Sequence, residues 1–230
     1  MAVLAERLVA EELMDDPALP VADYTAVLHD LARVNRVTMA YRPTLAFMRR
    51  AIRRRKRISV LDVGFGDGDM LRRIARLASS QGIEARLVGV DLNGNSVAAA
   101  REATPLALPI TYLHGDYADY AGEGWDCVIS SLVAHHMTPE QLLAFLRFMD
   151  AEARVGWFVN DLHRRAVAYF GYPILAAVMG WHPIVRHDGR VSIARSYRPD
   201  EWQSNLHRAD VAGARVFRAF PFRLCVEKLR

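Results

Sequence analysis

Cysteine is scarce in this sequence. Only Cys127 and Cys225 occur among its 230 residues, and both lie in apolar, strand-like runs without a C-x-x-C or metal-ligand spacing. That usage is typical of buried free thiols in a reducing cytoplasm. The amino-terminal residues also lack the basic-then-apolar order of a signal peptide. We therefore expect a cytoplasmic protein.

Long apolar runs are missing as well. The longest uncharged stretch of note, residues 166–181, is too short to predict a membrane span, and Gly171 and Pro173 interrupt it. We expect no stable membrane insertion. This aromatic-rich segment has three open interpretations: a lid over an apolar or aromatic ligand, plain core, or contact with a membrane surface. An exposed face on it could equally serve a homodimer.

Several motifs with known chemistry are absent. The sequence contains no G-x-G-x-x-G dinucleotide fingerprint, no P-loop and no H-E-x-x-H. Histidines are numerous, but no such spacing organises them, so we predict no metal site. The N/D-P-P-Y/F/W motif is also absent, and the segment after the predicted fourth strand reads Ser-Ser-Leu-Val.

Positive charge is concentrated in one place. The net charge is +4, and residues 49–57 carry seven basic side chains in nine positions. Such a run could bind RNA phosphates. It has no interleaved aromatic residues to stack on bases, and it stands at the end of a predicted helix, where basic side chains complement the helix dipole. We favour a solvated helix end and expect no nucleic-acid partner.

Periodicity indicates the fold class. Apolar residues at helical spacing indicate helices over residues 1–56, interrupted at Asp15-Asp16-Pro17, and short apolar strands then alternate with amphipathic helices. This alternation predicts an α/β fold with a doubly wound, mostly parallel sheet, closed by an antiparallel hairpin near the carboxyl end. The predicted strands are residues 58–63, 86–91, 109–113, 125–130, 154–160, 214–218 and 222–228, and the predicted helices lie near residues 68–79, 94–103 and 138–150.

The most informative segment is a glycine-rich turn between the first strand and the next helix. Gly64, Gly66 and Gly68 stand at every second position, so the backbone can turn sharply and approach a ligand closely. The helix that follows presents free N–H groups to an anionic part of that ligand. Asp91 ends the second strand, where a carboxylate can accept hydrogen bonds from both hydroxyls of a ribose. The pattern indicates a nucleoside-cofactor site.

The run from Leu61 to Gly68 closely resembles motif I of the class I S-adenosylmethionine-dependent methyltransferases, acid-x-G-x-G-x-G. The match is good over about residues 58–161 and loose elsewhere. The resemblance implies a seven-stranded Rossmann-like methyltransferase fold. It also implies an N-terminal helical cap over residues 1–56, a cofactor-binding domain over 57–230, and a substrate lid inserted after strand five at about 164–197.

The same resemblance implies which residues bind S-adenosylmethionine. Asp62, Gly64 and Gly66 would lie near its methionine portion, and Asp91 would bind the ribose. Asp116 would contact the adenine amino group, although an ordinary turn aspartate is a real alternative. Arg42 could pair with the methionine carboxylate or be a surface arginine. The predicted cofactor-binding residues are Asp62, Gly64, Gly66, Gly68, Asp91, Leu92, Asp116, Tyr117, Ser131 and Arg42.

Three histidines are candidates for the chemistry on the acceptor. His135 and His136 follow the fourth strand, and either could take a phenol or carboxylic-acid proton as the methyl group transfers, or could merely hydrogen-bond the turn. His163 follows the fifth strand in a segment that resembles methyltransferases of phenolic or polyketide-derived metabolites. It could act as a base or anchor, or stand on a helix capped by Asp161. Arg195 is a weaker candidate for the acceptor pocket.

We predict a methyltransferase acting on a small aromatic acceptor, with O-methylation of a phenolic hydroxyl preferred. C-methylation of an electron-rich ring would use the same site. An RNA or protein methyltransferase guided by residues 49–57 is a second enzyme class, and a non-catalytic cofactor-binding scaffold is the alternative outside enzymes.

Overall fold

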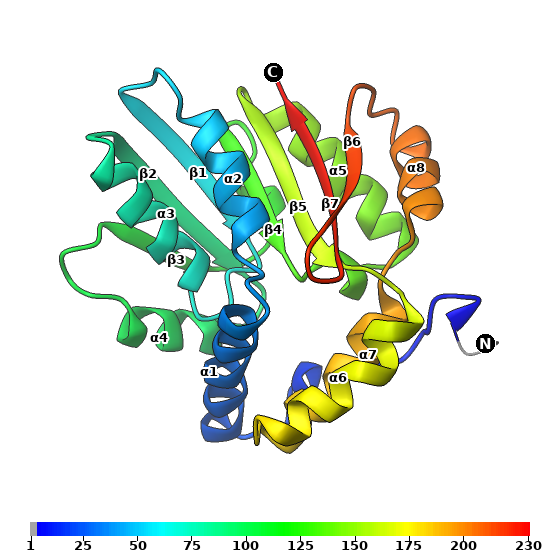
Figure 1. Cartoon of the computed structure of the whole chain (residues 1–230). Helices are drawn as coiled ribbons and strands as arrows, with labels where there is room; N and C mark the ends of the chain where they lie inside the picture. The colour runs from blue at the N-terminus through cyan, green and yellow to red at the C-terminus, as the bar shows by residue number, and fades with distance from the viewer. Residues whose placement is uncertain (1–3) are drawn as a thin grey trace.

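Seven strands form one sheet in the computed structural model, which describes residues 4–230 (Figure 1). Their order is β3-β2-β1-β4-β5-β7-β6. Within this sheet, β7 runs antiparallel to both of its neighbours, whereas the pairs from β3 to β5 are parallel. The predicted fold class and the closing hairpin are confirmed. The strands are β1 Arg57–Val63, β2 Glu84–Asp91, β3 Ile110–His114, β4 Cys127–Ser131, β5 Gly156–Leu162, β6 Arg215–Ala219 and β7 Arg223–Leu229.

Helices α3, α4 and α5 match the ranges predicted for them, 68–79, 94–103 and 138–150, to within two residues. Local signals explain their starts. The Asn93 side chain accepts a hydrogen bond from Asn95 N–H at the start of α4, and Thr138 forms a capping box with Gln141 at the start of α5. The helices are α1 Val21–Val37, α2 Arg42–Ala51, α3 Asp69–Ser80, α4 Gly94–Ala103, α5 Pro139–Glu152, α6 Ala166–Val178, α7 Pro183–Arg195 and α8 Pro199–Arg208.

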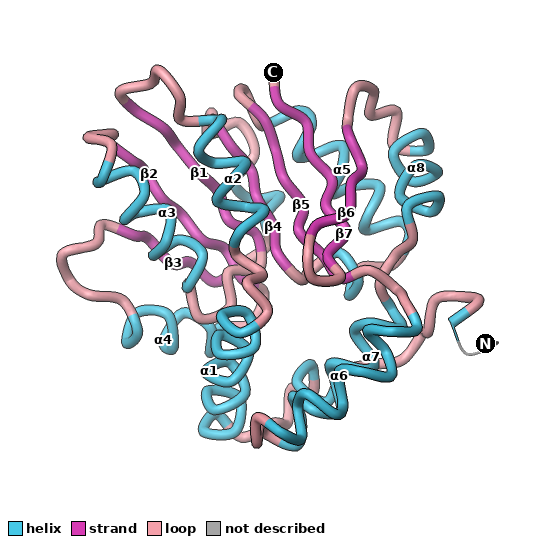
Figure 2. The backbone as a smooth tube through the Cα atoms, viewed as in Figure 1, coloured by secondary structure: helices cyan, strands magenta, loops and turns pink. Residues whose placement is uncertain are grey.

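Helices cover both faces of the sheet (Figure 2), and the buried side chains of the strands divide between these two layers. In β1, Ile58 and Val60 belong to the cluster that includes α2 and α3. Leu61 and Val63 belong to the opposite cluster, which includes α5 and α8. Because successive residues of a strand point to opposite faces, one short apolar run covers both layers. The sheet is therefore buried on both sides, and a ligand must bind at one of its ends.

The amino-terminal segment differs from the prediction. Residues 5–12, predicted as helical, are irregular, and the 3₁₀ turn η2, Leu13–Asp15, follows them. Tertiary contacts replace helical ones. Leu13 and Met14 donate their N–H groups to the Asp188 carboxylate at 3.0 and 2.9 Å, and Leu8 N–H donates to Ala194 O. The segment is thus shaped by α7 and not by its own periodicity.

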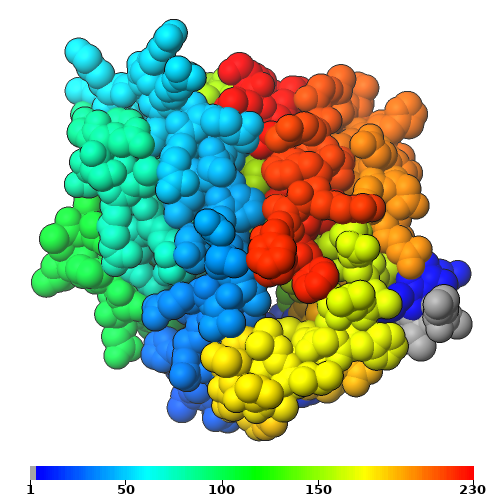
Figure 3. Space-filling view, in the orientation of Figure 1, coloured from blue at the N-terminus to red at the C-terminus, as the bar shows by residue number. Residues whose placement is uncertain are grey.

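The residues predicted as an N-terminal cap divide into two parts. Helix α2 packs on the sheet, where Phe47 stacks on Phe158 with ring centroids 5.1 Å apart. Helix α1 instead lies beyond the carboxyl ends of the strands. It packs there with α6 and α7, as the shared cluster around Val27 and Ala176 and the adjoining blue and yellow surfaces of Figure 3 show.

The segment inserted after β5 is helical. Residues 164–197, predicted as a lid, contain all of α6 and α7. The outer face of α6 exposes apolar side chains, namely Val167, Phe170, Ile174 and Val178. Dimer contacts on this face stay a prediction. Across residues 4–230, none of the helices combines the length and apolar character needed to cross a bilayer.

Candidate functional site

A cavity of about 410 Å³ opens at the carboxyl ends of β1, β2, β4 and β5, beneath α1, α6 and α7. This is the edge of a doubly wound sheet where ligands bind. Two parts of its wall differ in chemistry. The glycine-loop half comprises Asp62, Gly64, Gly66, Asp91, Leu92, Tyr117 and Ser131, and the histidine half comprises Glu12, Asp15, His135, His136, Ser192 and Arg223.

The glycine loop needs its glycines for conformation and for space. Gly64 has φ +74°, a left-handed conformation that side chains disfavour. A Cβ there would lie 2.3 Å from Cγ2 of Val133, another residue of the cavity wall. Gly68 also has positive φ, but its Cβ would meet the Tyr112 ring, so this glycine supports the loop from outside the cavity.

Two carboxylates give the glycine-loop half its charge. Asp91 accepts Gly66 N–H on Oδ2 at 3.0 Å and Asn93 N–H on Oδ1 at 2.9 Å, and burial raises its pKa. Burial and the nearby charge of Asp91 raise the pKa of Asp62 to about 8. This half of the cavity therefore favours a ligand that carries positive charge.

The end of β4 also faces this half. Ser131 Oγ is buried without a hydrogen-bond partner in the described part of the chain, and Ser131 lines the cavity. A buried hydroxyl left unpaired is unfavourable, so a ligand hydrogen bond suits it. The next residue, Leu132, has φ +63° although it is not glycine, and its N–H donates to Asn160 O at 2.9 Å. Strained backbone of this kind is concentrated at functional sites.

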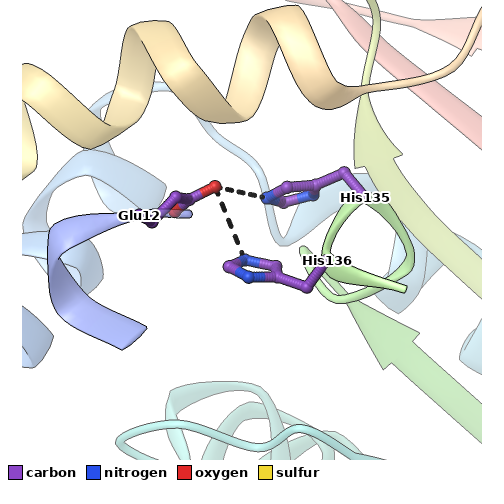
Figure 4. A group of neighbouring side chains, drawn as sticks. All are labelled: Glu12, His135 and His136. Atoms are coloured by element: carbon purple, nitrogen blue, oxygen red, sulfur yellow. Dashed lines mark ion pairs between the residues drawn. The ribbon is translucent and has the colours of Figure 1, made fainter. Parts of the chain in front are cut away.

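In the histidine half, each imidazole is oriented by an aspartate through Nδ1. His135 Nδ1 lies 2.7 Å from Asp161 Oδ1, and His136 Nδ1 lies 2.9 Å from Asp15 Oδ2. Both Nε2 atoms then face Glu12 Oε1, at 3.5 Å from His135 and 3.7 Å from His136 (Figure 4). Asp161 also accepts His135 N–H at 2.9 Å, which fixes the turn after β4 to the end of β5.

The carboxylates decide the protonation of His135. Burial alone would lower its pKa, but the charge and hydrogen bond of Asp161, together with the nearby carboxylate of Glu12, outweigh burial and raise the pKa to about 9. The pKa values of the two carboxylates, Glu12 and Asp161, shift in the opposite direction. Burial tends to raise the pKa of Glu12 and of Asp161, yet their histidine partners hold both pKa values below the ordinary range. His135 therefore holds a proton at neutral pH.

Two arginines complete the electrostatics. Arg195 Nη1 is buried 3.8 Å from both Glu12 Oε1 and Asp15 Oδ2. Arg223, on β7, is buried and lines the cavity, and its Nη2 donates to Asn35 Oδ1 at 3.3 Å. Its Nη1 has no hydrogen-bond partner among residues 4–230. A buried guanidinium with a free N–H group suits an anionic or strongly accepting ligand atom.

Four predicted residues do not line the cavity. Gly68 faces Tyr112, and Asp116 is exposed and accepts Ala118 N–H at 2.9 Å, as an ordinary turn aspartate does. Arg42 is exposed, and its guanidinium lies 3.3 Å from Met39 Sδ. His163 is buried away from the cavity. Burial and neighbouring arginines lower its pKa to about 4, and its N–H donates to Phe222 O.

The sequence missed four residues of the histidine half, one of which is Ser192 on α7. Glu12 and Asp15 stand in the irregular amino-terminal segment, more than 100 positions from the histidines, and no motif marks them. Arg223 stands in a run that alternates apolar and polar residues, and nothing in that pattern distinguishes it from the other polar residues of the strand. The remaining predicted residues (Asp62, Gly64, Gly66, Asp91, Leu92, Tyr117, Ser131, His135 and His136) all line the cavity.

Known proteins share parts of this architecture. A family model described as "Methyltransferase domain" matches residues 60–154. Among curated proteins, no sequence matches at a significant level.

Solved structures resemble most of the chain. That of the plantazolicin methyltransferase BpumL, in complex with a monoazolic desmethylPZN analog and SAH, is 12% identical with a TM-score of 0.64, and the match covers 90% of this chain and 91% of that one. Magnesium protoporphyrin IX methyltransferase from Synechocystis, with bound SAH, is 17% identical with a TM-score of 0.58, over 94% of this chain and 90% of that one. A SAM-dependent methyltransferase from Aquifex aeolicus is 18% identical with a TM-score of 0.53, over 74% and 80%. At these identities the likeness establishes the fold.

Proposed function

The chain is an S-adenosylmethionine-dependent methyltransferase, and we propose that it methylates a hydroxyl oxygen of a small aromatic acceptor. The observation that carries the proposal is the composition of the cavity. An apolar wall meets a pair of aspartate-oriented histidines and a buried arginine, all at the same edge of the sheet as the glycine loop.

The glycine-loop half fits the cofactor. S-adenosylmethionine carries an ammonium and a sulfonium, and the buried carboxyl of Asp62, with its pKa raised to about 8, is stabilised as an anion by a neighbouring cation. We assign Asp62, Gly64 and Gly66 to the methionine portion and Asp91 with Leu92 to the ribose. Ser131 Oγ offers its unpaired hydroxyl to the same ligand. Tyr117 lines the wall where the adenine is expected, whereas Asp116 caps a turn.

When bound, the cofactor supplies a methyl group on a positively charged sulfur, so the residues of this chain have three tasks: to orient the acceptor, to exclude water and to manage its proton. Helices α1, α6 and α7 exclude water. They also provide apolar surface for an aromatic ring, from Val27, Leu31, Val34, Tyr172 and Val185.

His136 is the histidine that we assign as general base. His135 is fully buried and keeps its proton at neutral pH, so it cannot accept another. His136 lines the cavity with its side chain partly exposed, and Asp15 holds Nδ1, which leaves Nε2 to face the cavity. Arg223 supplies positive charge for an ionised hydroxyl or a ring carboxylate of the acceptor.

The basic run 49–57 is in the wrong place to guide RNA into this cavity. It follows α2 and reaches the amino end of β1, whereas the cavity lies at the carboxyl end, roughly 20 Å away along seven residues of strand. Arg50 pairs with Glu227, Arg57 pairs with Glu84, and Arg55 Nε donates to Ala51 O at the end of α2. These contacts favour the solvated helix end.

The test is a methyl-transfer assay with isotopically labelled S-adenosylmethionine. The panel contains phenols, resorcinols, hydroxybenzoic acids and quinols, with total RNA and a protein lysate beside them. We expect label on the hydroxyl oxygen of an extractable aromatic product. His136→Gln should lower kcat by roughly 100-fold or more, as loss of a general base does. His207→Gln, on the exposed surface of α8, is the matched control and should change little.

Each other result has a definite meaning. Label on a ring carbon would replace O-methylation by C-methylation in the same cavity. Label confined to RNA or protein would overturn the small-molecule proposal. Cofactor binding without label on any acceptor would favour a scaffold, because the panel spans the acceptor chemistry that the cavity suits.

A further inference from the structure

Three side chains in the histidine half converge on one point from distant parts of the chain. His135 and His136 come from the turn after β4, and Glu12 comes from the amino-terminal segment that α7 holds in place. Their ligand atoms (two imidazole Nε2 atoms and one carboxylate oxygen) all lie within 4.8 Å of one another (Figure 4). Two imidazoles and one carboxylate form a common donor set for divalent transition metals.

The spacing of these atoms suits an ion better than direct hydrogen bonds. Glu12 Oε1 lies 3.5 Å from His135 Nε2 and 3.7 Å from His136 Nε2, beyond the usual range for N–H···O contacts. Two ligands bound about 2.1 Å from a tetrahedral ion lie about 3.4 Å apart. The two histidines and the glutamate therefore stand near the positions that such ligands occupy.

The surroundings fix both imidazoles for coordination through Nε2. Asp161 Oδ1 holds His135 Nδ1 at 2.7 Å, and Asp15 Oδ2 holds His136 Nδ1 at 2.9 Å. A carboxylate on the far nitrogen sets the tautomer and the ring orientation, as it does behind metal-bound histidines. Ser192 Oγ donates to Glu12 Oε1 at 2.8 Å and so positions the third ligand.

Charge balance also leaves room for a dication. With neutral imidazoles, the carboxylates of Glu12, Asp15 and Asp161 outnumber the two guanidinium groups beside them, Arg195 and Arg223, so the group keeps a net negative charge. Either protons on the imidazoles or one divalent ion offsets this charge. The two states are alternatives, because both use the Nε2 atoms.

We propose that Glu12, His135 and His136 form a binding site for a single divalent transition-metal ion, with Zn²⁺ the best match to the donors, and with a coordination position open to the cavity. Asp161 and Asp15 are positioning residues for it. A hydroxyl bound to such an ion ionises more readily. The ion would thus take over, in the proposed function, the proton management that His136 performs in the metal-free protein.

The test measures metal binding without any acceptor, so its result is separate from that of the methylation assay. Chelator-treated full-length protein is titrated with Zn²⁺ by competition against a chromophoric chelator, and with Co²⁺ by visible absorption. We expect one equivalent bound with a dissociation constant below about 10 μM, and a ligand-field spectrum of low coordination number. Glu12→Gln and His136→Ala should each weaken binding roughly 100-fold, and Asp15→Asn roughly 10-fold.

His29→Ala and His207→Ala are matched controls, since both remove exposed histidines outside the cavity, and they should bind as the wild type does. S-adenosylhomocysteine binding, measured on every variant, verifies that each is folded. A dissociation constant above about 10 μM in the wild type, or equal losses in the control variants, would overturn the proposal and leave Glu12 as an ion-pair partner of the protonated His135. The metal titration and the methylation assay have separate readouts, so a failure of one proposal is distinguished from a failure of the other.

Discussion

The two halves of the cavity are assembled in different ways. The glycine-loop half comes mostly from two consecutive strand–turn units, and Asp62, Gly64, Gly66 and Asp91 lie within 30 residues of one another. The histidine half collects Glu12, His135, Ser192 and Arg223 from four segments spread over the whole chain. The proposed cofactor site is therefore carried by a local motif, whereas the proposed acceptor site depends on tertiary contacts.

The halves also differ in how their charges are compensated. Burial raises the pKa of both Asp62 and Asp91, and the charge of Asp91 raises that of Asp62 further, so a cation bound in the glycine-loop half would stabilise both carboxylates. In the histidine half, the carboxylates and the imidazole of His135 satisfy each other, which moves their pKa values in opposite directions. The carboxylates of the glycine-loop half need a bound cation to ionise readily, whereas His135 and Asp161 already form an ion pair.

The largest effect should come from closing the glycine loop. Gly64→Ala would place Cβ 2.3 Å from Val133 Cγ2 in a left-handed conformation, so the cavity wall must shift. We expect S-adenosylhomocysteine affinity, measured by calorimetry, to fall by roughly 100-fold or more, the equivalent of about 3 kcal/mol. Gly82→Ala is the matched control, with φ +65° but no atom within 4 Å of the added Cβ. It should cost only about 1–2 kcal/mol of stability and leave affinity unchanged; equal affinities for the two variants would contradict this account.

The next effect concerns the pH dependence of stability. Because the folded pKa of His135, about 9, exceeds its ordinary 6.5, the stabilisation is complete below pH 6.5 and is lost as pH rises through 9. Chelator-treated wild type should lose on the order of 2–3 kcal/mol of unfolding free energy over that window.

Urea unfolding of wild type and His135→Gln across pH 6–9.5 isolates this effect, because Asp62 titrates in both proteins and cancels in the difference. His207→Gln, which removes a surface histidine, should follow the wild type. A wild-type curve parallel to that of His135→Gln would show that the Asp161–His135–Glu12 group does not hold its extra proton.

The smallest expected effect is the release of a proton from the glycine-loop half when the cofactor binds. With its pKa raised to about 8, the Asp62 carboxyl is mostly protonated at pH 7 in the free protein, and a bound cation favours the ionised form. Binding of S-adenosylmethionine should therefore release up to one proton per site. Calorimetry in buffers of different ionisation enthalpy measures it, and Asp62→Asn should abolish it while the His207→Gln control retains it. Net proton uptake by the wild type would refute the assignment of Asp62 to the cationic portion.

Much of the fold was predictable because its signals are local. A short apolar run such as 58–63, followed by a glycine turn, favours a strand buried on both faces. Gly64, Gly66 and Gly68 permit the positive φ angles that the tight turn before the helix requires. Where the chain is shaped from a distance, prediction failed. Leu4, Leu8 and Leu13 have helical spacing, yet the Asp188 carboxylate on α7 takes the N–H groups of Leu13 and Met14. Asp116 followed the expected order of motifs and nonetheless serves its own turn.

The sequence by itself determined the sheet, its order of elements and the cofactor loop, since periodicity, glycine and strand-end acids act over a few residues. Only the tertiary structure decided which carboxylates reach the histidines. Hydrogen-bond distances of 2.7 Å from His135 to Asp161 and 2.9 Å from His136 to Asp15 arise after the amino-terminal segment folds onto α7 and β5 lies beside β4. Charge interactions depend on separation in space, and separation along the chain carries no information about them.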